Sequence, residues 1–419
     1  MQTSLADFIR DTPQGREADA ILRKCVHCGF CNATCPTYQL LGDELDGPRG
    51  RIYLMKQMLE GAPVTERTRL HLDRCLTCRA CETTCPSGVE YGRLVDIGRA
   101  LIEERAPSRG QIARLTRAAL AFALPRTRLF GAALRLGQLV RPLLPGALKA
   151  KVPSRASAPG VWPAPRHTRR MLVLAGCVQP LLAPSINAAA ARVLDFAGVS
   201  LLEARGAGCC GAVRFHLNDQ EGGRDDMRAL IDAWWPSVER GEVEAIVMTA
   251  SGCGSTVREY AHYLAQDPAY RDKAARIAGM TRDLSEVVAA EAEALGAQWG
   301  GAAPRGRVAF QSPCSLQHGQ QIRGLVEALL ARAGYELTPV AEAHLCCGSA
   351  GTYSILQPAL SIKLRARKLG ALQAGVPAQI ATANIGCLAH LQAGTETPVR
   401  HWIELIDEAL RGGAGDNSA

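Results

Sequence analysis

A cysteine pattern that occurs twice near the N-terminus constrains this chain more than any other feature. Cys25, Cys28, Cys31 and Cys35 recur 50 residues later as Cys75, Cys78, Cys81 and Cys85, and a proline follows the last cysteine of each run. A second duplication relates the remaining eight cysteines, which are Cys177, Cys209, Cys210 and Cys253, then Cys314, Cys346, Cys347 and Cys387. All 16 cysteines therefore belong to one of two internal repeats.

The N-terminal runs have the spacing C-x2-C-x2-C-x3-C-P, which bacterial ferredoxins use to bind a [4Fe–4S] cluster. A residue before proline is pushed out of the helical region, so the fourth cysteine points away from its own loop. In two-cluster ferredoxins this fourth cysteine is a ligand of the other cluster. The pattern therefore predicts two [4Fe–4S] clusters, one held by Cys25, Cys28, Cys31 and Cys85, and the other by Cys75, Cys78, Cys81 and Cys35.

Two other uses of these cysteines, disulfide bonds and zinc sites, are less favoured. The first 20 residues have no continuous apolar stretch and contain four acidic residues, so we expect no secretory signal and a cytoplasmic chain. Because thiols stay reduced in the cytoplasm, we do not expect disulfide bonds. A pair of structural zinc sites is the other alternative, but zinc takes four ligands from two separated pairs and does not need a third cysteine at the same spacing.

The spacing of apolar residues predicts an α+β multidomain fold. We expect a mainly α di-cluster ferredoxin-like domain over residues 1–104, with helices at 17–24, 49–59 and 66–74. Two α/β repeats follow over 171–295 and 306–419, with buried strands at 171–175, 245–249, 308–311 and 379–383. Cys177, Cys253, Cys314 and Cys387 are expected in loops after these strands, where the chemistry of parallel sheets is usually located.

The segment between these parts, residues 105–170, is strongly basic. It contains 14 of the 48 Lys and Arg residues and no Asp or Glu, and its apolar residues recur at helical spacing. We expect two short amphipathic helices that contact an acidic partner or anionic lipid headgroups, with a merely solvated linker as the alternative. Nucleic acid is not expected as a partner, because no DNA- or RNA-binding motif is present.

The double N-terminal motif followed by two Cys…Cys-Cys-Gly…Cys repeats resembles the iron-sulfur subunit family shared by glycolate oxidase, anaerobic glycerol-3-phosphate dehydrogenase and the lactate-utilisation proteins. The resemblance covers nearly the whole chain. The stretches 346–353, 384–387 and 397–402 are most similar to the glycolate oxidase branch.

The resemblance implies an electron-transfer subunit of a glycolate (2-hydroxy acid) oxidase complex, which passes electrons from a flavoprotein to a quinone or another acceptor. The implied partners are an FAD-containing dehydrogenase subunit and a further flavoprotein-like subunit, with peripheral contact to the cytoplasmic face of the inner membrane. Because the chain has no usable flavin or nicotinamide fingerprint, we expect it not to be catalytic alone. The alternative is a thiol–disulfide oxidoreductase similar to heterodisulfide reductase.

The sequence leaves two alternatives for the C-terminal repeats, which either bind a further iron-sulfur cluster or contain no metal. In heterodisulfide reductase the related repeat has a fifth cysteine three residues after the last one, where this chain has Thr256 and His390. An imidazole is a better iron ligand than a threonine hydroxyl, so Cys314, Cys346, Cys347 and Cys387, with His390, are the better candidates, and Cys177, Cys209, Cys210 and Cys253 the weaker ones. The alternative is that these thiols pack as small hydrophobic groups without metal.

Overall fold

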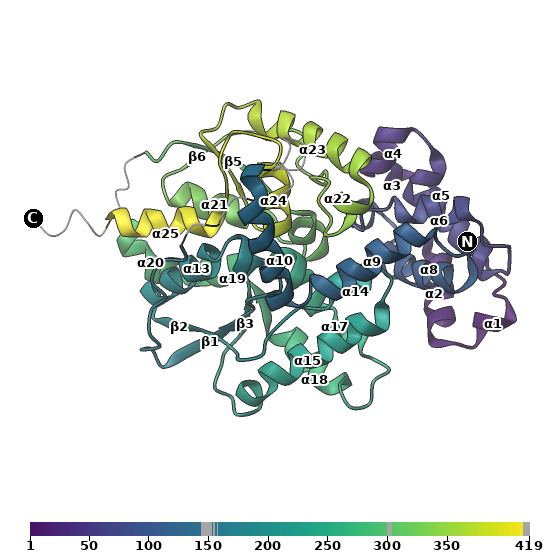
Figure 1. Ribbon diagram of the computed structural model, residues 1–419, viewed down its shortest axis with the longest axis horizontal. Coiled ribbons are helices and arrows are strands. Elements are labelled where there is room, and N and C mark those ends of the chain that lie inside the picture. The colour runs from purple at the N-terminus through teal and green to yellow at the C-terminus, as the bar shows by residue number, and fades with distance from the viewer. Residues whose placement is uncertain (144–152, 154–155, 157, 300–303, 414–419) are drawn as a thin grey trace, which may run out of the picture.

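The structure is a computed structural model of the chain, and it describes residues 1–143, 153, 156, 158–299 and 304–413 (Figure 1). A helical N-terminal domain lies beside a larger α/β part, and a helical connector joins the two (Figure 1). The predicted α+β multidomain fold is thereby confirmed.

Short helices build the N-terminal domain around a core of apolar side chains such as Leu22, Met55 and Leu94. The hydroxyl groups of Thr12 and Thr65 accept hydrogen bonds from backbone N–H groups in the first turns of α2 and α6, which fixes where these helices begin. The elements are α1 (Asp7–Arg10), α2 (Pro13–Lys24), α3 (Phe30–Ala33), α4 (Pro36–Leu41), η1 (Glu44–Asp46), α5 (Pro48–Leu59), α6 (Glu66–Asp73), α7 (Ala80–Thr84) and α8 (Tyr91–Arg105). The helices expected at 17–24, 49–59 and 66–74 are α2, α5 and α6.

The basic connector contains two helices, α9 (Gln111–Ala123) and α10 (Thr127–Val140), followed by the short helix η2 (Arg141–Leu143). Pro125 separates α9 from α10. Part of the positive charge is neutralised within the chain, because Arg109 and Arg117 pair with Asp73 of α6. The remainder of the connector up to residue 157 lies mostly outside the described residues.

The C-terminal part contains two parallel four-stranded sheets with the same topology. Their strand orders are β2-β1-β3-β4 and β6-β5-β7-β8. The first sheet consists of β1 (Arg169–Val173), β2 (Val199–Glu203), β3 (Ile246–Met248) and β4 (Thr281–Asp283), and the second of β5 (Arg307–Gln311), β6 (Glu336–Leu337), β7 (Gln379–Thr382) and β8 (Val399–His401). The four strands that the sequence predicted are β1, β3, β5 and β7.

Helices connect and cover these strands. In the first repeat they are α12 (Gln179–Leu182), α13 (Ser185–Phe196), α14 (Ala212–His216), α15 (Gln220–Glu239), α16 (Ser251–Arg258), α17 (Tyr260–Tyr263), α18 (Arg271–Met280), α19 (Leu284–Ala290) and α20 (Ala292–Trp299). In the second repeat they are η3 (Ser315–Gly319), α21 (Leu325–Arg332), α22 (Tyr353–Leu356), α23 (Pro358–Gln373), α24 (Ile385–Gln392) and α25 (Trp402–Gly413).

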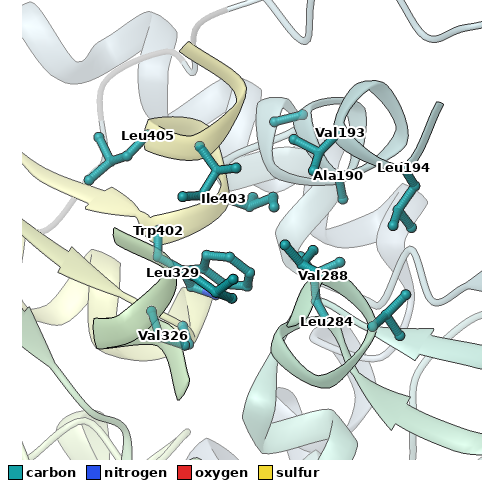
Figure 2. Close-up of a cluster of buried hydrophobic side chains, with 14 of the residues drawn as sticks. Ala190, Val193, Leu194, Leu284, Val288, Val326, Leu329, Trp402, Ile403 and Leu405 are labelled. Carbon is teal, nitrogen blue, oxygen red and sulfur yellow. The ribbon is translucent and has the colours of Figure 1, made fainter. Parts of the chain in front are cut away.

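The two repeats share one hydrophobic core. Val193 on α13 and Val288 on α19 come from the first repeat, whereas Leu329 on α21 and Trp402 on α25 come from the second, and all four belong to the same cluster (Figure 2). Trp402 is only 1% exposed, so its indole ring is buried among side chains of both halves. The repeats therefore form a single packed unit, which fixes the position of each set of cysteines relative to the other.

Candidate metal centres

The two N-terminal cysteine loops have the same backbone conformation. His27 and Gly29 in the first loop have positive φ angles of 58° and 84°, and the equivalent Thr77 and Arg79 have φ angles of 53° and 60°. A left-handed residue reverses the local course of the chain, and here such residues alternate with the cysteines. This alternation turns successive thiols toward the same side of each loop.

Cys25, Cys28, Cys31 and Cys85 lie around one small cavity of about 30 Å³, which Cys81 also borders. Burial, followed by the neighbouring thiols, raises the pKa of Cys31 to about 11. Cys28 is exposed at the protein surface. This group of thiols, which we call the outer group, is the set that the sequence assigned to one cluster.

Cys35, Cys75, Cys78 and Cys81 form a second, inner group. Hydrogen-bond donors surround its sulfur atoms: the Thr77 N–H and the Tyr91 hydroxyl lie 3.4 Å and 3.7 Å from Cys75 Sγ, and Arg51 Nη1 lies 4.0 Å from Cys35 Sγ. Burial raises the pKa of the Cys75 thiol, but the positive charges of Arg51 and Arg99 outweigh it and leave that pKa below its usual value. The environment of Cys75 thus favours a thiolate, the form that binds iron.

A buried carboxylate balances Arg51. Asp46 is fully buried; its Oδ1 lies 3.5 Å from Arg51 Nη2 and 3.0 Å from His71 Nδ1, and its Oδ2 lies 2.7 Å from Arg74 Nη1. Asp43, Asp46 and His71 have the spacing of a metal site. The two guanidinium groups already neutralise Asp46, so we interpret this cluster as an ion-pair network behind Cys35.

In each C-terminal repeat a glycine shapes the paired-cysteine turn. Gly211 and Gly348 follow the two adjacent cysteines and have φ angles of 86° and 90°. A Cβ atom would lie 2.5 Å from the Gly223 carbonyl oxygen at Gly211, and 2.6 Å from the Ser361 carbonyl oxygen at Gly348. Both the conformation and the close approach of α15 in the first repeat and α23 in the second therefore require glycine.

The four thiols of each repeat meet at the carboxyl ends of the strands. In the second repeat, Cys346 contacts Cys314 and Cys347, and Cys347 also contacts Cys387. The hydrogen bond with Cys346, together with burial, raises the pKa of Cys314 well above its usual value. The expected loop position was wrong for two cysteines, because Cys253 and Cys387 lie in the first turns of α16 and α24, which begin directly after short strands.

The first repeat brings its thiols together in the same way. Cys209 accepts hydrogen bonds from Cys177 and Cys210, which lower the pKa of Cys209 well below its usual value. The same contacts raise the pKa of Cys177 and Cys210. Thr256, at the position of the missing fifth cysteine, donates its hydroxyl proton to the Gly252 carbonyl oxygen, 3.1 Å away.

His390 lies behind the thiols of the second repeat. Its Nε2 atom is 3.2 Å from the Ser361 hydroxyl oxygen, and burial lowers its pKa to about 4. Thr256 borders the cavity shared by the thiols, whereas His390 is not among the residues that border it. The role of His390 as a ligand stays a prediction.

A larger cavity of about 300 Å³ lies where the N-terminal domain meets both repeats. Cysteines from three of the four groups border it, namely Cys75, Cys78, Cys177, Cys210, Cys253, Cys314, Cys346, Cys347 and Cys387. Cys78 is close enough to Cys314 and Cys346 for their charges to interact. The inner group and the thiols of the second repeat are therefore direct neighbours.

The cavity is also bordered by polar residues that the sequence analysis missed, among them Asp96, His216 and Glu259. These residues come from α8, α14 and the end of α16, which are separate segments of the chain, and none belongs to a cysteine motif. No pattern within one segment could have identified them.

The cysteine groups fit iron-sulfur clusters chemically. Several buried thiols with raised pKa values stand in contact in each repeat, so they cannot all ionise unless a cation supplies the compensating charge. Iron supplies that charge and takes thiolate ligands. The inner group also has N–H and O–H donors directed at sulfur, which cluster sites use to stabilise negative charge.

Comparison with protein families agrees with this division. Residues 21–89 match the family model for a 4Fe-4S dicluster domain, and residues 171–258 and 308–392 each match the model for a cysteine-rich domain. The prediction of [4Fe–4S] clusters is thereby confirmed, whereas the assignment of individual cysteines to clusters stays a prediction.

Several curated proteins are similar over most of this chain. The glycolate oxidase iron-sulfur subunit of Escherichia coli (strain K12) is 52% identical over 98% of this chain and 99% of its own length. A protein of Bacillus subtilis (strain 168) named "Probable glycolate oxidase iron-sulfur subunit" is 30% identical over 90% of this chain and 89% of its own length. Lactate utilization protein A of Exiguobacterium sp. is 25% identical over 56% of this chain and 96% of its own length.

Proposed function

This chain belongs to the family of glycolate oxidase iron-sulfur subunits, as the sequence predicted, and we propose that it carries electrons within a complex that oxidises glycolate. The oxidation of a 2-hydroxy acid to a 2-oxo acid releases two electrons and two protons. In our proposal a flavoprotein subunit removes them, and this chain passes the electrons to a quinone. The observation that carries the proposal is the continuous series of cysteine groups from the surface to the interior.

The outer group is the proposed entry point for electrons. Cys28 is exposed, and two apolar residues next to the outer cysteines, Val26 and Phe30, are 68% and 60% exposed. Exposed apolar side chains beside a polar rim are typical of protein–protein contacts. We propose that the flavoprotein subunit docks over this loop.

The inner group and the second repeat continue the series. When bound, a [4Fe–4S] cluster accepts and donates one electron at a time. Cys25, Cys28, Cys31 and Cys85 would hold one cluster, and Cys35, Cys75, Cys78 and Cys81 the other. Cys314, Cys346, Cys347 and Cys387 are the proposed ligands of a further cluster, and their proximity to Cys78 supports this assignment.

The proposal can be tested with Cys78→Ser in the reconstituted complex. Glycolate should still reduce the flavin of the partner, but electron transfer to an external acceptor should fall to background, because the inner group loses a ligand. Thr84→Ser, a change next to Cys85, is the control and should behave like the wild type. Full transfer in the Cys78→Ser variant with an unchanged cluster spectrum would contradict the proposal.

The connector helices are the proposed membrane contact. Ile112, Leu115, Leu136 and Leu139 are 64–83% exposed, and exposed arginines such as Arg114 lie on the same helices. Such a combination suits a helix that lies in the headgroup region of an anionic bilayer. Within the described residues, none of the helices has the length and apolar content needed to span a bilayer.

Vesicle flotation tests this contact. A variant with Arg114, Arg128 and Arg135 changed to Gln should leave anionic vesicles at lower salt than the wild type, because electrostatic attraction is screened by salt. Arg109 and Arg117 are left unchanged because they pair with Asp73. Identical release curves would favour the solvated-linker alternative.

The disulfide-reductase alternative is not favoured. The relatives that match the whole chain are named as glycolate oxidase subunits. The position of the fifth cysteine is occupied in the first repeat by Thr256, whose hydroxyl group donates a hydrogen bond to the backbone of its own helix, and in the second repeat by His390.

A further inference from the structure

The 300 Å³ cavity has a polar part that the cysteine groups do not explain. Its lining there includes Arg79, Asp96, Arg99, Arg117, His216 and Glu259. The 300 Å³ of the whole cavity include the space beside the nine bordering cysteines as well as this polar part. The polar part lies next to Cys75 and Cys78 of the inner group, which border the same cavity.

The positive charges in this part already have partners. Arg79 pairs with Glu259 and with a second glutamate, and Arg117 lies 3.4 Å from a carboxylate oxygen of Asp73. Arg99 donates to two backbone carbonyl oxygens, at 3.1 Å and 2.7 Å. Because each guanidinium group is engaged, the site is poorly suited to a carboxylate or a phosphate and better suited to a neutral ligand.

Two other side chains present polar groups to the cavity. Among the residues that the structure describes, neither the Asp96 carboxyl group nor the His216 ring has a hydrogen-bond partner. His216 borders the cavity from α14, and Asp96 borders it from α8. Burial raises the pKa of Asp96 to about 7, and the enclosure lowers the pKa of His216 to about 4. A protonated carboxyl group and a neutral imidazole each offer one hydrogen-bond donor.

We propose that Asp96 and His216 bind the headgroup of a quinone in this cavity. The inference rests on the proposed function and gives its acceptor a binding site. A quinone ring is neutral and planar, and its two carbonyl oxygens need hydrogen-bond donors. On reduction, the quinone takes up two electrons that derive from the 2-hydroxy acid, and each carbonyl oxygen gains one proton to become a hydroxyl group. Asp96 and His216 would each donate a hydrogen bond to one of these two oxygens.

The connector helix α9 supplies a path for the apolar tail of such a ligand. Arg117 on one side of α9 borders the cavity, whereas Ile112 and Leu115 on the other side are 83% and 70% exposed. Figure 1 shows α9 beside α8 and α14, the helices that carry Asp96 and His216. A lipophilic tail that leaves the cavity along α9 would reach the apolar surface that we assign to the membrane.

Calorimetric titration of the anaerobically purified, cluster-loaded full chain with a short-chain ubiquinone tests the proposal. We expect one binding site per chain. Asp96→Leu should weaken binding about fivefold to tenfold, because one hydrogen bond is lost. His216→Trp should abolish binding, because the larger ring fills the cavity. Asp272→Leu is the matched control on the exposed surface of α18 and should bind like the wild type. The absence of binding by the wild type, or equal affinities for all variants, would overturn the proposal.

A second measurement does not depend on folded variants. A photoreactive quinone should label peptides of α8 or α14 in the wild-type chain, and labelling confined to other segments would overturn the assignment. Glycolate-driven reduction of a soluble dye by the wild-type complex separates the two proposals. If the dye is reduced but no quinone binds, the cavity assignment fails alone; if glycolate does not reduce the dye, the proposed function fails.

Discussion

Replacing Gly348 with alanine should destabilise the C-terminal unit by about 3 kcal/mol. A non-glycine residue in the left-handed region costs roughly 1–2 kcal/mol. The added Cβ atom would also lie 2.6 Å from the Ser361 carbonyl oxygen and 2.9 Å from Leu364 Cβ, so the backbone of α23 must move. Overpacking of this kind typically costs about 1–3 kcal/mol. Gly324 has a similar φ of 73° but nothing within 4 Å of its Cβ position, so Gly324→Ala should cost only the conformational term.

Thermal unfolding followed by circular dichroism distinguishes these two terms. For a unit of this size about 1 kcal/mol corresponds to a midpoint shift of about 2–4 °C, so we expect about 6–12 °C for Gly348→Ala and about half of that for Gly324→Ala. Gly211→Ala should behave like Gly348→Ala, because its Cβ atom would lie 2.5 Å from the Gly223 carbonyl oxygen. Equal shifts for Gly348→Ala and Gly324→Ala would refute the view that the paired-cysteine turn is held by close packing.

Three other predictions follow from the same geometry. Cys35→Ser should remove the same cluster as Cys78→Ser, as judged by electron paramagnetic resonance of the reduced chain, and loss of two different clusters would exclude the crossed ligation. Trp402→Ala should destabilise the shared core by about 3–5 kcal/mol in denaturant unfolding, and a loss below about 1 kcal/mol would show that the repeats are stabilised separately. The pKa of Asp96 is raised to about 7 in the folded chain, so the free energy of unfolding should fall as pH rises from about 4 to 7. Asp96→Asn removes this dependence, so the stability of the variant relative to the wild type should be higher at pH 8 than at pH 5. A stability difference that is the same at both pH values would contradict this.

The sequence predicted the parts of the structure that local patterns determine. Regular apolar spacing located helices α5 and α6 within one residue of their observed ends. The cysteine offsets identified both duplications, and the identical strand orders of the two sheets agree with the second of them. Strand β6 was missed because it has only two residues, and β2, β4 and β8 because polar or charged residues such as Ser200, Arg282 and Arg400 interrupt their apolar pattern.

Contacts between distant segments could not be predicted in this way. The pairing of Arg109 and Arg117 with Asp73 removes part of the charge that the sequence assigned to external partners. The neighbourhood of Asp96 and His216 depends on how the N-terminal domain packs against the first repeat, and both residues lie outside the cysteine motifs. Charge and spacing within one segment do not determine which segments meet.

The packing of the N-terminal domain gives the two similar repeats different environments. On the side of the second repeat, Thr83 lies 2.9 Å from His318 Nδ1, and the Tyr353 hydroxyl donates to the Arg74 carbonyl oxygen, which brings Cys346 next to Cys78. On the side of the first repeat, Arg79 pairs with Glu259, and the Gln220 side-chain amide donates a hydrogen bond to the Asp96 carbonyl oxygen. The polar part of the cavity lies beside these contacts. The two copies of the duplicated sequence therefore meet the N-terminal domain in different ways, the second next to Cys78 of the inner group and the first next to the polar part of the cavity.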